Sequence, residues 1–212
     1  KPAKPNVPSI FKTDGNGIII GYTCEKDDLP KALVIPAKIG AEDITGIGYK
    51  AFQNCTGLTS LDLSGCASLT TIDMNAFQDC TGLTSLDLSG CASLTTIDMN
   101  AFKGCTGLTD VRFHENLAKI GVQAFNGCTG LTDVQFPENL TAIGWRAFYD
   151  CTVLTRVIFE DKTGWAVYDD DKYNTKHADI TSSDLNDFSK AAKYLREIPR
   201  NDGYSNKYWK KN

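Results

Sequence analysis

Apolar residues along the chain follow two patterns that alternate and recur. In the first pattern, leucines stand at positions 58, 61 and 63, and the last two alternate with polar residues. Such alternation is typical of a half-buried β-strand. The pattern recurs four times, at Leu83, Leu86 and Leu88, at Leu108, Val111 and Phe113, at Leu131, Val134 and Phe136, and at Leu154, Val157 and Phe159. We therefore predict a series of equivalent strands.

The second pattern must turn the chain back between these strands. It consists of the pairs Leu69 and Ile72, Leu94 and Ile97, Leu117 and Ile120, and Leu140 and Ile143, each followed by an Ala-Phe pair and a cysteine. The Ala-Phe pairs begin at Ala51, Ala76, Ala101, Ala124 and Ala147, at intervals of 25, 25, 23 and 23 residues. Residues 76–100 repeat residues 51–75 with one exchange, Asp79 for Asn54. Self-similarity at this period indicates stacked units that bury their apolar faces on one another.

A unit of this size with a Leu-x-x-Leu-x-Leu strand is a leucine-rich repeat. We predict an α/β-type leucine-rich repeat solenoid, a mainly parallel β right-handed coil with short helical or irregular returns. Its strands would stack about 4.8 Å apart along one concave face. Stacking turns each repeat position into a ladder, so we expect an internal aromatic spine of Phe52, Phe77, Phe102, Phe125 and Phe148.

The ends of the chain differ from the repeats and divide it into four parts. We expect an extended, proline-rich linker over residues 1–8, an N-terminal cap with a degenerate first repeat over 9–50, repeats over 51–160 and a C-terminal cap over 161–212. In this cap, Leu185, Phe188, Ala192 and Leu195 have helical spacing and predict one helix from Asp184 to about Glu197, with Ser183 as its N-cap. The cap's packing residues would be Trp165, Tyr204, Tyr208 and Trp209.

The segments Ile47–Leu61 and Leu140–Cys151 resemble the BspA-like, or Treponema-type, leucine-rich repeat of bacteria, and the resemblance covers about residues 32–159. It implies a secreted or surface-attached protein that adheres to host extracellular-matrix or cell-surface proteins, or to other bacterial surface proteins, without catalysis. It supplies no defined binding motif. Asp73-Met74 and Asp98-Met99 replace the family's usual Ile-Gly step, which makes the local turn there an open question.

The charge and hydropathy of the chain exclude some classes of partner. The formal net charge is −4 and the pI about 5.2, whereas nucleic-acid binding needs clustered Lys and Arg. No apolar run approaches the roughly 18 residues of a membrane span, so we expect no membrane-spanning segment. The chain begins without Met and without an apolar signal core, which suits an exported protein whose signal was removed.

Eight cysteines in an exported chain raise the question of disulfides. Cys55, Cys80, Cys105, Cys128 and Cys151 share one repeat position, and we interpret them as small core residues. Cys66 and Cys91 lie in the longer loops of adjacent units, where a bridge remains a second possibility. We expect no zinc site, since no Cys-x-x-Cys pair or nearby histidine is present.

The remaining candidates for chemistry are weak. His114 and His177 lie in different contexts, and no spacing joins either one to a nucleophile and an orienting group. Asp169–Asp171 lacks the spaced acidic pattern of a calcium loop and is better explained as a solvated turn. We therefore predict no enzyme activity and no cofactor.

Residues between the buried strand positions form a polar strip on the predicted concave face. The candidate partner-binding residues on this strip are Arg112, His114, Gln135, Arg156, Asp110, Asp133, Asp62 and Asp87. Arginine is enriched in interface hot spots, and Arg112 and Arg156 lie where the chain departs from its duplicated copies. An extracellular protein-interaction or adhesion module is the leading interpretation. A passive spacer or surface-coat component is second, and a glycan-binding protein is third because the strip shows no aromatic ladder.

Overall fold

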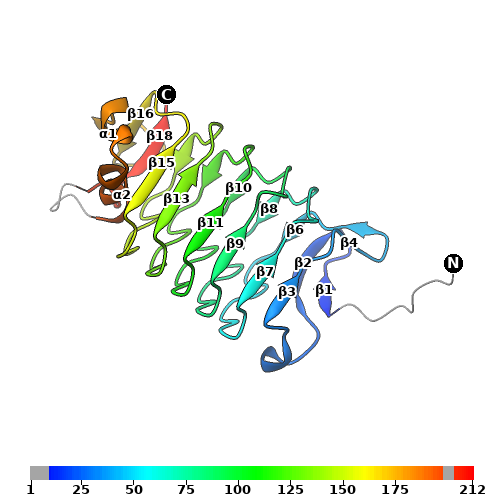
Figure 1. The fold of residues 1–212 in the computed structure, drawn as a ribbon. Helices are drawn as coiled ribbons and strands as arrows, with labels where there is room; N and C mark the ends of the chain where they lie inside the picture. Colours follow the sequence, from blue (N-terminus) through cyan, green and yellow to red (C-terminus); the bar gives the residue numbers. More distant parts are fainter. Residues whose placement is uncertain (1–9, 198–202) are drawn as a thin grey trace.

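The computed structural model describes residues 10–197 and 203–212, so the linker predicted at residues 1–8 lies outside the described part. The chain winds as a solenoid of stacked turns, and two layers of short strands run along its length (Figure 1). Helices occur at the C-terminal end of the stack, beside β15 (Arg156–Phe159). The leucine-rich repeat solenoid predicted from the sequence is confirmed.

One layer contains the strands of the Leu-x-x-Leu-x-Leu pattern. The strands β3 (Ala32–Val34), β7 (Ser60–Asp62), β9 (Ser85–Asp87) and β11 (Asp110–Arg112) form a parallel sheet, and β13 (Asp133–Phe136) and β15 continue the stack as a parallel pair. Equivalent repeat positions pair in register, for example Leu61 with Leu86 and Leu86 with Val111. Because Leu33 pairs with Leu61, the degenerate first repeat supplies β3. We call the outer surface of these six strands the strand face.

The other layer is a ten-stranded sheet, which we call the return sheet. Its parallel middle is β2 (Ile18–Tyr22), β6 (Gly46–Ile47), β8 (Thr71–Ile72), β10 (Thr96–Ile97), β12 (Lys119–Ile120) and β14 (Ala142–Ile143). The antiparallel β1 (Phe11–Thr13) covers one edge, and β18 (Tyr208–Lys211), β16 (Trp165–Tyr168) and β17 (Lys176–Asp179) extend the other. A 3₁₀-helix, η1 (Lys26–Asp28), and a hairpin of β4 (Lys38–Ile39) and β5 (Glu42–Asp43) complete the N-terminal part. Both ends of the return sheet therefore leave the repeat pattern.

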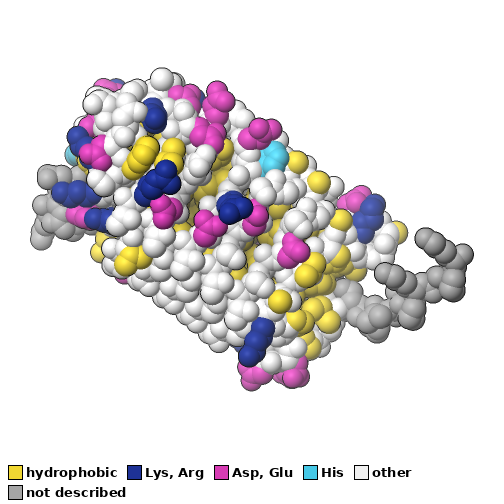
Figure 2. Space-filling model, in the orientation of Figure 1, with side chains coloured by type: hydrophobic (Ala, Val, Ile, Leu, Met, Phe, Trp, Pro, Cys, Tyr) yellow, Lys and Arg dark blue, Asp and Glu magenta, His cyan; other side chains and the backbone are white. Residues whose placement is uncertain are grey.

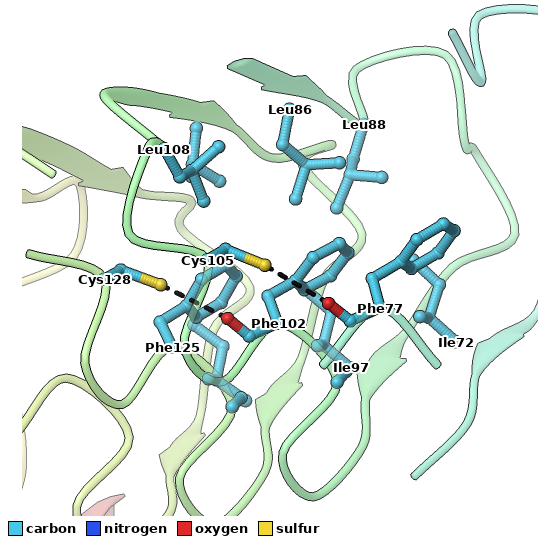
Figure 3. Packing of buried hydrophobic residues seen from close by; sticks show 14 of the residues in the cluster. Ile72, Phe77, Leu86, Leu88, Ile97, Phe102, Cys105, Leu108, Phe125 and Cys128 are labelled. Carbon is cyan, nitrogen blue, oxygen red and sulfur yellow. Dashed lines mark hydrogen bonds between the residues drawn. The ribbon is translucent and has the colours of Figure 1, made fainter. Parts of the chain in front are cut away.

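The predicted aromatic spine forms the core. The five phenylalanines that follow the repeat alanines are at most 1% exposed, and their rings stack with centroids 5.2–5.4 Å apart (Figure 3). Tyr22 extends the stack beyond Phe52 at 5.8 Å. Offset-stacked rings at such distances are favourable beyond the area they bury. The spine thus joins successive turns along the whole array.

The ladder cysteines are buried beside this spine, as expected. The thiol of Cys128 donates a hydrogen bond to the carbonyl of Phe102 (3.3 Å), and that of Cys105 donates to Phe77 (3.2 Å), so each thiol ties its turn to the preceding one (Figure 3). All eight cysteines are free, including Cys66 and Cys91. The possible bridge between these two is not formed, and each thiol donates to a backbone carbonyl of the preceding turn.

Two left-handed residues bend each turn around its phenylalanine. One precedes the alanine, as in Asn75 (φ 60°) and Asn100 (φ 56°), and the other precedes the cysteine, as in Asp79 (φ 58°) and Gly104 (φ 73°). Asparagine, aspartate and glycine are the residues that tolerate this region best. The position before the cysteine is Asn, Asp or Gly in every copy, whereas the position before the alanine also holds Lys50, Gln123 and Arg146 in the same conformation.

The replacement of the usual Ile-Gly step leaves the local turn unchanged. The backbone N–H of Asp98 donates to Ile72 (3.0 Å), and that of Gly121 makes the same bond to Ile97 one turn later (2.8 Å). The carboxylate of Asp98 also accepts a hydrogen bond from the next backbone N–H, of Met99 (2.6 Å). Aspartate therefore takes the glycine position without loss of the ladder.

The prediction of one C-terminal helix is wrong. The structure has two helices, α1 (Ser182–Asn186) and α2 (Phe188–Arg196), with Thr181 rather than Ser183 as the first N-cap. The helix breaks at Asp187, which has extended backbone and caps α2 by accepting hydrogen bonds from two N–H groups. Helix α2 packs on β15, and the rings of Trp165 and Trp209 pack against Phe159 of that strand.

Candidate functional site

A groove of about 370 Å³ lies on the strand face across β11, β13 and β15. It occupies the half of the strand face where charged side chains gather around exposed apolar atoms (Figure 2). The residues that line it are Ser89, Asp110, Val111, Arg112, Phe113, Asp133, Val134, Gln135, Pro137, Arg156, Ile158 and Glu160. We call it the strand-face groove.

The floor of the groove is apolar because side chains of the shorter, 23-residue copies surface there. Phe113 and Ile158 are partly exposed, and Pro137, which also lines the groove, is buried. In the 25-residue copies the corresponding strands carry only small or short polar residues outward, such as Ser85 and Asp87. The groove therefore begins where the duplicated copies end.

Two loose ion pairs line the walls. Asp110 lies 3.5 Å from Arg112 and Asp133 lies 3.9 Å from Arg156, and all four side chains are about half exposed or more. Exposed pairs of this kind contribute at most about 1 kcal/mol to stability. Because folding gains little from them, these charges are available to a partner.

Glu160 closes one end of the groove through hydrogen bonds. Its carboxylate accepts from the amide of Gln135 (2.8 Å) and from the backbone N–H of Glu138 (3.1 Å). At the opposite end of β15, the guanidinium of Arg156 lies 5.2 Å from the ring centroid of Phe188, at the start of α2. Such a cation–π contact holds the arginine in place over the groove.

The structure brings together five of the eight candidate residues named from the sequence. Asp110, Arg112, Asp133, Gln135 and Arg156 all line the strand-face groove. His114 does not, because its Nδ1 accepts a hydrogen bond from the backbone N–H of Asn116 (3.1 Å) in a local turn. The part of these residues in binding stays a prediction.

Asp62 and Asp87 have a local role as well. Each carboxylate accepts a hydrogen bond from the backbone N–H two residues on, of Ser64 and Ser89, at 2.9 Å. Hydrogen bonds from the side chain and backbone of the same serine lower the pKa of each aspartate. Asp62 and Asp87 thus stabilise the turns at the ends of their strands and do not line the groove.

Sequence reasoning missed Phe113 as a groove residue and Phe188 as the ring that contacts Arg156 of the groove. Phe113 occupies a strand position that the alternation assigns to the interior, and the structure leaves part of its ring exposed to the groove. Phe188 was expected on the buried face of a continuous helix, yet the break at Asp187 leaves it 38% exposed. The signal for both was present only in the tertiary structure.

The other polar clusters are tied to local structure. His177 lies 3.7 Å from Asp169 and packs its ring against Tyr204, while Asp170 accepts hydrogen bonds from the N–H groups of Lys172, Asn174 and Thr175. Within residues 10–197 and 203–212, no group of three or more His, Cys, Asp or Glu side chains is placed to hold a metal ion. The acidic segment 169–171 is a hydrogen-bonded turn.

The fold and the strand face define a leucine-rich repeat protein. The chain belongs to the family of the BspA type leucine-rich repeat region, whose model matches residues 39–165 in six copies. Among solved structures it is similar to the T. pallidum leucine-rich repeat protein TpLRR, with 31% identity and a TM-score of 0.60 over 73% of this chain and 71% of that one.

A more distant similarity is to a leucine rich cell surface protein from Faecalibacterium prausnitzii A2-165, with 23% identity and a TM-score of 0.44 over 74% of this chain and 53% of that one. None of the curated proteins compared with the sequence matches it. In the described part of the chain, no helix is both long and apolar enough to cross a bilayer.

Proposed function

We propose that the protein is a non-catalytic, extracellular interaction module that binds a partner protein through the strand-face groove. The proposed partners are host extracellular-matrix or cell-surface proteins, or other bacterial surface proteins, and the proposed location is the cell surface or the medium. Membership of the BspA type repeat family supports this role. The observation that carries it is the groove itself, the place where the repeats change from small polar residues to arginines around an apolar floor.

The chemistry of the groove suits a protein partner. Hot spots of protein interfaces combine arginine and aromatic side chains in a site that a partner can desolvate. Arg112 and Arg156 flank the exposed part of Phe113, and Asp110 and Asp133 lie within 4 Å of the two guanidinium groups. A partner segment with an apolar side chain between charged ones would replace these loose pairs with buried contacts.

The double variant Arg112→Ala with Arg156→Ala tests the proposal. We expect it to lose at least about tenfold in affinity for any protein captured by the parent chain, since hot-spot truncations cost about 2 kcal/mol or more each. Its melting temperature should stay near that of the parent, because exposed side chains contribute little to folding. Capture from matrix and cell-surface extracts, followed by affinity measurement with the purified partner, gives the comparison.

A control variant with the same change in net charge distinguishes an effect of the strand-face groove from an effect of net charge. Lys12→Ala with Lys31→Ala removes the same two positive charges from exposed positions of the N-terminal part. It should bind like the parent. An equal loss of affinity in both double variants would mean that the arginines act only through long-range electrostatic attraction. Undiminished binding by the arginine variant would mean that the partner binds at another surface of the protein.

The duplicated copies favour a second function for the N-terminal half. In residues 51–100 the outward strand residues are serines and turn-forming aspartates, and the aspartates are already satisfied by their own backbone. Such a surface suits a passive spacer that sets the distance of the groove from whatever precedes it. A parent chain that captures nothing from any extract would extend this spacer function to the whole molecule.

A further inference from the structure

A second groove, of about 360 Å³, lies on the return sheet where the repeats meet the C-terminal cap. It is lined by Thr96, Asp98, Met99, Lys119, Gly121, Val122, Gly144, Asp171, Tyr173 and Tyr208. They come from β10, β12 and the turns that follow β10, β12 and β14, and from β18 and the turn between β16 and β17 in the cap. The strand-face groove belongs to the opposite layer and shares no residue with it. We call this second site the cap groove.

Glycines in the floor of the cap groove let successive turns pack closely against one another. A side chain at Gly121 would place its Cβ 2.7 Å from the backbone of Asp98, and one at Gly144 would place it 2.5 Å from the backbone nitrogen of Val122. These positions accept only glycine without a shift of the backbone. The result is a shallow apolar floor that continues along Met99 and Val122.

Two tyrosines of the cap form the facing wall. β18 runs antiparallel beside β14, which brings Tyr208 close to Gly144. Tyr173 lies 6.5 Å from Tyr208, edge to face, and has a left-handed backbone at φ 58°. That conformation is an outlier for a bulky residue, and such residues persist where surrounding structure holds them. Here Asp170 holds the turn through three backbone N–H groups.

Charged and polar groups surround the aromatic wall. The ammonium of Lys210 lies over the Tyr173 ring, 4.6 Å from its centroid, and Tyr168 packs edge-on against the same ring at 5.4 Å. In the part of the chain that the structure describes, neither Lys119 nor Asp171 has an ion-pair partner, and Asp98 uses one oxygen for the N–H of Met99. Burial raises the pKa of Tyr173 and of Tyr208, so both phenols are neutral hydrogen-bond donors at physiological pH. Donors and acceptors of both kinds thus ring an apolar floor.

We propose that the cap groove binds a neutral sugar ring. A pyranose presents an apolar C–H face, which complements the negative π-face of an aromatic ring, and hydroxyl groups at its edge that both donate and accept. The cap groove offers that combination, and its volume falls in the range of about 300–1,000 Å³ typical of small-molecule sites. Polyanions are disfavoured by Asp98 and Asp171, and a simple cation is disfavoured by Lys119.

The test uses the full chain and a panel of trisaccharides of glucose, galactose, mannose and N-acetylglucosamine. Saturation-transfer NMR detects binding, and chemical-shift changes at the amides of Gly121 and Gly144 locate it. We expect at least one trisaccharide to bind at millimolar concentration or below. Failure of every sugar in the panel to bind would overturn the proposal.

The variant Tyr173→Asn removes the ring but retains a residue suited to the left-handed turn. It should fold as well as the parent and lose at least about tenfold in sugar affinity. Tyr49→Ser removes an exposed tyrosine that does not line the groove and should bind like the parent. Equal sugar affinity in Tyr173→Asn and the parent would refute the assignment. So would sugar binding that leaves the amide chemical shifts of Gly121 and Gly144 unchanged.

Discussion

At the residue scale, the molecule depends on ladders of identical side chains. Phe77, Phe102 and Phe125 stack almost parallel, with interplanar angles of 1° and 8° between neighbours. Each ring therefore contacts an equivalent ring on both sides, and no other packing arrangement serves every turn equally. This ladder could be predicted from the sequence, because stacked repeats place equal positions above one another.

The variant Phe102→Ala should destabilise the protein by about 3–5 kcal/mol, through lost burial and the cavity left between two rings. Chemical unfolding of the parent and the variant measures the difference. Thr106→Ala, at an exposed position of the same turn, should unfold like the parent. A Phe102→Ala curve that overlays the parent would contradict the stacked core.

The buried thiols make stability depend on alkaline pH. Burial is the main cause that raises the pKa of Cys105 to about 12, above the unfolded value of about 8.5. A group whose folded pKa is raised contributes fully below its unfolded pKa and loses that contribution as pH rises toward the folded pKa. The relevant window therefore runs from about pH 8.5 to pH 12.

In reducing buffer, Cys105→Ala should weaken the fall of unfolding free energy with pH in this window by about 1.4 kcal/mol per pH unit. Urea unfolding at several pH values measures the slope for parent and variant. Thr106→Ala, which removes no ionisable group from an exposed position of the same turn, is the control and should keep the parent slope. Identical slopes for Cys105→Ala and the parent would show that this thiol ionises in the folded state.

At the scale of elements, the step from the return strand into the turn decides which residues each repeat accepts. Gly121 lies against the backbone of the preceding turn, whereas Asp98 occupies the equivalent position one turn earlier and keeps the same backbone hydrogen bond. The sequence showed the exchange but not its outcome, because only the structure shows how closely successive turns approach at each copy.

Gly121→Ala should therefore cost about 1–3 kcal/mol, since its Cβ would lie 2.7–2.9 Å from three backbone atoms. Gly57→Ala meets nothing within 4 Å and should be neutral or slightly stabilising. Thermal unfolding of the two variants under one condition gives the contrast. Equal melting temperatures would mean that the turn relaxes to admit a methyl group.

The capping elements show where prediction from sequence fails. Leu185, Ala192 and Leu195 are buried as their spacing predicts, but Phe188 is not, because Asp187 ends one helix and caps the next. Aspartate is a strong N-cap, so Asp187 can either continue one helix or end it and begin another. The spacing of the apolar residues alone does not decide between these two outcomes. The groove contact between Phe188 and Arg156 depends on this break.

At the scale of the whole molecule, the fold was predictable and the site only in part. Parallel stacking, the spine and the buried cysteines follow from periodicity, which acts between adjacent turns. The strand-face groove depends on how deeply its floor lies and on charged side chains from three strands and the cap. Asp62 and His114 are on the strand face, yet each makes a hydrogen bond within its own turn and does not line the groove. Side-chain hydrogen bonds within a turn decide which polar residues remain available.

The duplication has a consequence for the length of the molecule. Deletion of residues 76–100 would join Asn75 to Ala101, a junction identical in sequence to the present one between Asn100 and Ala101. Turns of a solenoid interact mainly with their neighbours, so we expect the shortened chain to fold with the strand-face groove intact. Its free energy of unfolding should fall by about the contribution of one repeat and its interface with a neighbour. Circular dichroism and small-angle scattering measure the fold and the length.

The spacing of the strands turns this deletion into a displacement. Removal of one copy would move the strand-face groove toward the N-terminal end by one strand separation, about 4.8 Å, without altering any residue that lines it. The same arithmetic applies to an added copy. A change in copy number would therefore shift the strand-face groove along the solenoid axis in equal steps, while the residues that line the groove stay the same.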